Sequence, residues 1–244
     1  MTSHLHALGF DANDPILLAR FWAGVLGWEV NDAPDGDLDG GIVLLPGDDT
    51  GFRLRFLPRA GKKTLPNQLH FDLTSTSLDD QRETVARALA LGGRHIDVGQ
   101  TPEDGHVVLA DPEGNEFCVI EPGNNFLADC GFIGALSCDG SQDVGYFWSK
   151  ALGWPLVWDQ DQETAIRSPH GGPKVTWGGP PLNPKDGRNR LRFELAPPAD
   201  GDQRAEVDRL VSLGATRVGT DRDETGRVVM ADPDGNEFCV LTPR

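Results

Sequence analysis

Two short stretches of the chain combine residue types that can act as acids, bases, nucleophiles or metal ligands. His70 and Asp72 alternate with apolar residues, so a strand there places both polar side chains on one face. A histidine oriented by a carboxylate is a typical general acid or base. Glu116 and Cys118 alternate with apolar residues in the same way. Imidazole with thiolate would also suit zinc.

Arginines give a third stretch a basic face. Arg53 and Arg55 alternate with apolar residues in the segment 51–57, and arginine side chains bind carboxylates and similar anions. The alternative is that a carboxylate such as Asp72 simply neutralises one of them. Cys118 and Cys239 also have two interpretations, since cysteine is often a small buried hydrophobic residue.

Composition narrows the classes of partner. The chain has 244 residues and a formal net charge of −16, which disfavours nucleic acids and anionic membranes as partners. No apolar run is long enough for a membrane span, and the N-terminal residues do not resemble a signal peptide. Four cysteines without a Cys-x-x-Cys pattern indicate free thiols. We therefore expect a cytoplasmic protein.

The second half of the sequence repeats motifs of the first half. The segment Ala110–Ile120, which contains Asp-Pro-Glu-Gly-Asn-Glu-Phe-Cys-Val, returns as Ala231–Leu241 with one conservative change in its turn. Pro and Gly at those positions predict a hairpin whose outgoing strand carries the cysteine. Further repeats link the halves: Phe21-Trp22 and Leu26-Gly27-Trp28 return as Phe147-Trp148 and Leu152-Gly153-Trp154. The repeats predict two domains, residues 1–124 and 130–244.

Local patterns predict the elements that position these residues. Strands are expected at 4–12, 41–45, 51–57, 68–74, 94–98 and 106–110, with an acidic loop over Asp32–Gly41. Asp14 and Pro15 start a helix that stops at Gly27, and Ser77 with Asp80 starts another that runs to about Leu91. Each half thus contains two units of strand, helix and three strands.

This arrangement resembles the vicinal oxygen chelate (VOC) superfamily, which includes glyoxalase I, extradiol dioxygenases, fosfomycin-resistance enzymes and bleomycin-resistance proteins. The Phe-Trp…Leu-Gly-Trp helix, the Leu-His-Phe-Asp-Leu strand and the hairpin are similar to its glyoxalase-like branch. The resemblance implies an α+β fold of two tandem glyoxalase-like domains. Each domain would pair two βαβββ units in a curved, mostly antiparallel sheet, a cup with its helices outside. The halves would pack as an internal pseudo-dimer, which allows the chain to act as a monomer.

Metal-dependent relatives of this kind use a histidine in the first strand of a unit and a glutamate in its last. Carried over to this chain, those positions fall on Ala7, Arg53–Arg55, His70 and Cys118 in the first half. In the second half they fall on Ile133, a residue near Val175, Arg192 and Cys239. Only His70 is an expected ligand, so we predict no metal and no cofactor. A rearranged site from His70, Cys118 and Glu116, with His106 on the neighbouring strand, is the alternative.

The resulting hypothesis is a metal-independent cup that binds a small organic molecule. His70, Asp72, Arg53 and Arg55 would converge in it if the sheet order is the usual one, with Glu116 and Cys118 beside them. In the second half Arg192 and Cys239, which occupies the position of Cys118, are the candidate ligand-binding residues. The alternative is that Arg190, Arg192 and Glu194 neutralise one another in a structural domain. The alternatives are a divalent-metal lyase, isomerase or dioxygenase with altered ligands, and an assembly module without a small ligand.

Overall fold

Four copies of one structural unit make up the chain. The computed structural model describes residues 2–31, 41–47, 51–59, 61–101, 103–185, 188–219 and 226–244, so most of the predicted loop over Asp32–Gly41 lies outside the described residues. The first half contains β1 (His4–Ala12), α1 (Pro15–Leu26), β2 (Glu29–Asn31), β3 (Ile42–Leu45), β4 (Arg53–Pro58), β5 (Leu69–Leu73), α2 (Leu78–Ala90), β6 (Arg94–His95), β7 (Val107–Ala110) and β8 (Glu116–Val119).

A short 3₁₀ helix, η1 (Asn125–Leu127), joins this half to the second. The second half contains β9 (Ile133–Cys138), α3 (Gln142–Leu152), β10 (Leu156–Gln160), β11 (Glu163–Arg167), β12 (Lys174–Trp177), β13 (Leu191–Ala196), α4 (Gln203–Ser212), β14 (Thr216–Arg217), β15 (Val228–Ala231) and β16 (Glu237–Val240).

The helices begin where the sequence predicts. The Asp14 carboxylate accepts a hydrogen bond of 3.0 Å from the backbone N of Leu17, and Gly27 ends α1 in the left-handed region with φ of 70°, which favours glycine. Ser77 caps α2 in the same way, through the backbone N of Asp80. No helix in the described ranges is both long and apolar enough to cross a membrane. The predicted strand at 94–98 is shorter than expected, and β2 was not predicted because three residues are too few to give a strand pattern.

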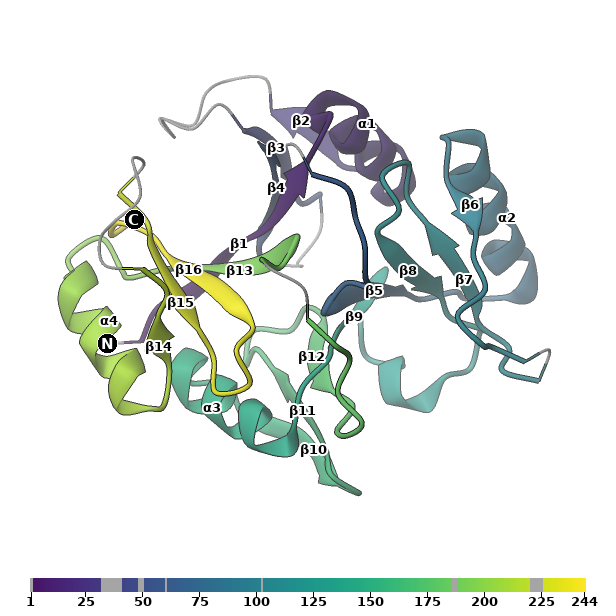
Figure 1. Ribbon diagram of the computed structural model, residues 1–244. Helices are drawn as coiled ribbons and strands as arrows, with labels where there is room; N and C mark the ends of the chain where they lie inside the picture. The colour runs from purple at the N-terminus through teal and green to yellow at the C-terminus, as the bar shows by residue number, and fades with distance from the viewer. Residues whose placement is uncertain are drawn as a thin grey trace.

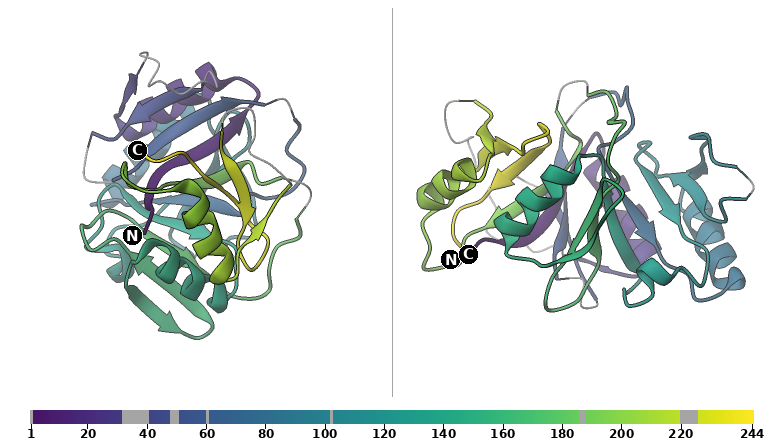
Figure 2. Two further views of the ribbon diagram at one scale, coloured as in Figure 1. Left: turned by 90° about the vertical axis from the view of Figure 1, so that its left-hand side faces the viewer. Right: turned by 90° about the horizontal axis from the view of Figure 1, so that it is seen from below.

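The strands form two eight-stranded sheets. Sheet A has the order β14-β15-β16-β13-β1-β4-β3-β2, and sheet B has the order β10-β11-β12-β9-β5-β8-β7-β6. The α+β fold with two curved, mostly antiparallel sheets is therefore confirmed. The assignment of units to sheets differs from the expectation. Sheet A joins the first unit to the fourth, sheet B joins the second to the third, and both chain ends lie beside sheet A (Figures 1 and 2).

The apolar faces of both sheets share one core. Helix α1 lies between β4 of sheet A and β8 of sheet B (Figure 1). Its Trp22 ring contacts Phe10 of sheet A and both Phe71 and Phe117 of sheet B, with centroid separations of 4.9–6.0 Å. Trp148 of α3 packs on sheet A in the same manner. The polar faces of the two sheets consequently point away from this core.

The repeated hairpin and the repeated helix hold each half together. Asp111, in the first hairpin, accepts a hydrogen bond of 3.2 Å from Trp22 Nε1, and Asp232 accepts one of 3.1 Å from Trp148 Nε1. Burial raises the pKa of Asp111 to about 6, although donors from Asn115 and Trp22 oppose that rise. Each half is thus joined by a tryptophan–aspartate contact, whereas each sheet is joined by strands from both halves.

Candidate functional site

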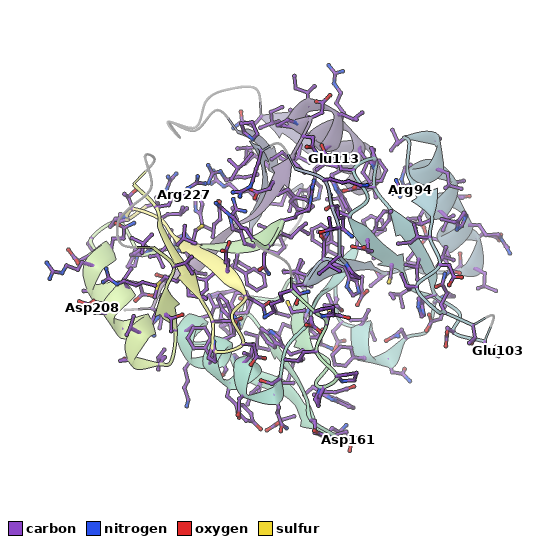
Figure 3. All side chains as sticks on the ribbon, in the orientation of Figure 1. Arg94, Glu103, Glu113, Asp161, Asp208 and Arg227 are labelled. Atoms are coloured by element: carbon purple, nitrogen blue, oxygen red, sulfur yellow. The ribbon has the colours of Figure 1, made fainter. Side chains whose placement is uncertain are left out.

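Opposite charges fill the polar face of sheet A. Arg55, on β4, has 1% of its side chain exposed, and its Nη1 lies 2.5 Å from Oε2 of the fully buried Glu194 on β13. Arg227, labelled in Figure 3, approaches the other oxygen of Glu194 at 3.5 Å. Arg192, also 1% exposed, places its Nη2 2.7 Å from Oδ1 of Asp11. A cluster of arginines and carboxylates therefore occupies this face, but Arg192 and Glu194 pair with Asp11 and Arg55 rather than with each other as the sequence suggested.

Other residues of sheet A and its surroundings also have neighbours that affect their charge. Cys239 is completely buried, and burial raises the pKa of its thiol, which disfavours the thiolate. Arg190 is not part of the Arg192–Glu194 cluster, because it binds Glu113 at 2.6 Å. Burial, with the nearby charge of Arg53, lowers the pKa of His4.

The expected convergence of the arginines with the histidine is wrong. Arg53 and Arg55 belong to β4 in sheet A, whereas His70 and Asp72 belong to β5 in sheet B. The physical reason is the pairing of units: β1 forms hydrogen bonds to both β4 and β13, and β5 forms them to β8 and β9. Each polar face is therefore built from both halves of the chain.

The polar face of sheet B holds a connected chain of polar side chains. His70 Nε2 lies 3.4 Å from Oδ1 of Asp72. Ser137 on β9 donates a hydrogen bond of 2.5 Å to Oδ2 of Asp72, and Thr176 on β12 donates one of 3.3 Å to Ser137. Cys118 on β8 is opposite Asp72 in the parallel ladder. Three atoms that could ligate a metal ion, one each from His70, Asp72 and Cys118, lie within 4.8 Å of one another.

The charge state of His70 follows from these neighbours. Burial acts to lower the pKa of His70, but its hydrogen bonds to Asp72 and Cys118 and their negative charges outweigh that effect. The pKa of His70 rises to about 10. Its side chain remains 35% exposed. The structure therefore presents a protonated, accessible imidazole flanked by a carboxylate and a sulfur.

Glu116 and His106 lie apart from this group. Glu116 forms an ion pair with Lys63 and accepts a hydrogen bond of 3.2 Å from the backbone N of Asn67. His106 Nδ1 lies 3.1 Å from the backbone oxygen of Asp104. Among the described residues, the only cluster of potential metal ligands is His70, Asp72 and Cys118. The proposed grouping of Cys118 with His70 is therefore present, but without Glu116 or His106.

The segment between the halves lies beside the same face. Lys174, next to Thr176 on β12, binds the backbone oxygen of Phe126 and lies 4.3 Å from the centre of its ring. Trp158 on β10 packs edge-on against Phe126, with ring centres 5.7 Å apart, and stays partly exposed. Phe126 and Trp158 thus lie together near β12 and β10, beyond Thr176 at the far strands of sheet B.

Two of these polar residues, Ser137 and Thr176, were not predicted from the sequence. Transfer of the ligand positions into the third unit selected Ile133 and a residue near Val175, and Ile133 and Val175 are both buried in the apolar core. Ser137 and Thr176 occupy the polar face instead, opposite each other in the β9–β12 ladder. The alternation of polar and apolar residues in β12 would have indicated Thr176, whereas the residues of β9 do not alternate in this way.

The two faces differ in how well they suit a metal ion. Guanidinium groups cannot ligate a cation, so the sheet A face does not fit one. His70, Asp72 and Cys118 supply nitrogen, oxygen and sulfur donors of the types zinc accepts. Their present contacts are to one another, and the raised pKa of His70 favours the protonated ring, which must lose a proton before it can bind a metal.

A separate polar hollow lies between the linker 61–68 and the residues before β13. It has a volume of about 220 Å³, and basic side chains dominate its lining. Several of them already have acidic partners: Arg59 and Arg188 contact Asp11, and Arg190 contacts Glu113. The hollow contains none of the clustered residues of sheet B.

Comparison with known proteins identifies the fold. A family model described as a glyoxalase-like domain matches residues 7–120 and 134–241, whereas no curated protein matches. Glyoxalase I from maize (Zea mays) superposes with a TM-score of 0.62 at 14% identity, covering 99% of this chain and 92% of that one. A candidate dioxygenase from Bacillus subtilis gives a TM-score of 0.61 at 16% identity, with 99% and 85% covered. The chain therefore belongs to the glyoxalase-like domain family, within the VOC superfamily, and carries that domain twice.

Proposed function

We propose that this protein binds a small organic molecule on the polar face of sheet B, without a metal, and that the sheet A face is structural. The main support for this proposal is that the side chains of the two faces differ in burial and in charge pairing. Arg55, Glu194 and Arg192 are almost completely buried and charge-paired, whereas His70 remains 35% exposed within a polar chain.

The chemistry of the sheet B face suits a ligand with both polar and apolar parts. The protonated His70 offers a charged hydrogen-bond donor, and hydroxyl groups follow on the two neighbouring strands. Trp158 and Phe126 offer aromatic surface at one side. A few convergent polar groups beside aromatic side chains are typical of small-molecule sites.

Thermal unfolding of the metal-stripped protein tests this proposal. The protein would be screened against small organic acids, alcohols and aromatic compounds. A ligand held at a hundredfold its dissociation constant stabilises by about 2.7 kcal/mol. Thr176→Trp, which fills the face, should remove the shift, whereas His95→Ala, an exposed histidine on the edge strand β6, should retain it. A screen without any shift would contradict the proposal and favour an assembly role.

A metal-dependent lyase, isomerase or dioxygenase is the second candidate. Its support is the proximity of three donor atoms from His70, Asp72 and Cys118. Metal analysis of protein purified without chelators separates the two candidates. Stoichiometric metal that is lost in His70→Ala would overturn the metal-free proposal, whereas protein without metal that still binds a ligand would support it.

A further inference from the structure

Cys118 differs from the other cysteines in its neighbours. Cys138 and Cys239 have pKa values raised by burial, and Cys130 follows η1 in the segment between the halves. Cys118 is partly exposed, and one ligand atom of His70 lies within 4.8 Å of its sulfur. This contact places an imidazole where it can act on a thiol.

The partners of His70 hold it in that position. Asp72 contacts the imidazole at 3.4 Å and is itself fixed by a hydrogen bond from Ser137, which in turn accepts one from Thr176. Cys118 on β8 therefore lies near His70 on β5, and His70 contacts Asp72 on the same strand. Ser137 on β9 holds Asp72, and Thr176 on β12 holds Ser137. A nucleophile, a base and a group that orients the base have this arrangement in covalent catalysis.

We propose that Cys118 is a nucleophilic thiol, paired with His70, that forms a covalent bond to small electrophiles with a carbon–carbon double bond conjugated to a carbonyl group. The proposal rests on the ligand site suggested above and names the chemical class that this site would accept. The imidazole of His70 lies beside the thiol, where it can exchange a proton with the sulfur and with the electrophile during the reaction.

The addition balances without an outside oxidant or reductant. The Cys118 thiolate forms a bond to the β-carbon of the electrophile, and the π electrons of the double bond move toward the carbonyl group. The His70 imidazolium then transfers its proton to the α-carbon. The products are a thioether and a neutral imidazole, so no charge is left over.

Labelling with N-ethylmaleimide, which contains such a double bond, tests the proposal on the full chain. The rate at each cysteine is followed by peptide mass spectrometry after metal removal. Cys118 should react roughly tenfold faster than Cys130 at neutral pH, as expected for a thiol that has a histidine partner. His70→Gln should slow Cys118 and leave Cys130 unchanged, whereas His95→Gln should change neither rate.

An unchanged labelling rate at Cys130, together with a cooperative thermal unfolding transition, shows that His70→Gln still folds. Cys118 reacting no faster than Cys130, or at the same rate with and without His70, would overturn the proposal. The saturated analogue N-ethylsuccinimide cannot react with the thiol, so it tests ligand binding separately from reactivity. If it displaces a ligand found in the thermal screen, the polar face of sheet B binds small molecules whether or not Cys118 is reactive.

Discussion

The two polar faces of the molecule share a scaffold but differ in what they hold. Sheet A buries Arg55, Arg192 and Glu194 in ion pairs of 2.5–2.7 Å. Sheet B carries a partly exposed histidine and a line of hydroxyl and carboxylate groups. Buried charges must be paired to be tolerated, so the side chains of sheet A satisfy one another. The comparison indicates that a duplicated cup can become structural while its counterpart keeps accessible functional groups.

The largest expected effect comes from breaking the sheet A cluster. Glu194→Ala leaves Arg55 buried without its carboxylate, which should reduce the free energy of unfolding by about 3–5 kcal/mol. Urea denaturation measures the change. The matched substitution in sheet B, Ser137→Ala, removes one partly exposed hydroxyl group and should cost about 0.5–1.5 kcal/mol.

A replacement of both partners provides the control for Glu194→Ala. Arg55→Met with Glu194→Leu removes the buried pair together, so much of the lost stability should return. A cost below about 1 kcal/mol for Glu194→Ala alone would mean that the ion pair is not required, and the contrast between the faces would then fail.

An intermediate effect is expected at Gly9 in sheet A. A Cβ atom added at Gly9 on β1 would lie 2.9 Å from Oε1 of Glu194, so Gly9→Ala must displace the ion pair. We expect a loss of about 1–3 kcal/mol in urea denaturation. Gly47→Ala, where no heavy atom lies within 4 Å of the added Cβ, is the matched control and should be nearly neutral. Equal effects of the two substitutions would contradict a tightly filled face.

A further effect concerns how the stability of the protein depends on pH through His70 in sheet B. The pKa of His70 rises from 6.5 to about 10 in the folded protein. The folded chain therefore holds this proton more tightly than the unfolded chain. The resulting stabilisation is fully present below pH 6.5 and declines as the pH rises toward 10.

Ring ¹⁵N chemical shifts of His70 test that charge state. The imidazole should be largely protonated at pH 8, and Asp72→Asn should lower its pKa because the negative partner is lost. A neutral ring at pH 8 in the unaltered protein would show that Asp72 and Cys118 do not hold the proton on His70.

Sequence reasoning predicted local structure better than it predicted the site. The caps at Asp14 and Ser77 and the repeated hairpins are short-range features, so their residue types determine them directly. The pairing of β1 with β13, and of β5 with β9, joins residues that are far apart in the sequence. Alternation shows which residues share a face but not which strands are neighbours. For this reason Arg55 was grouped with His70, and Ser137 and Thr176 were missed.

A crystal structure with a ligand from the thermal screen would show which of the two faces binds it. We expect difference density on the polar face of sheet B, in contact with His70 and beside Cys118 and Ser137, while the Arg55–Glu194 pair stays intact. Ligand density on the polar face of sheet A, with that ion pair opened and the sheet B face empty, would contradict it.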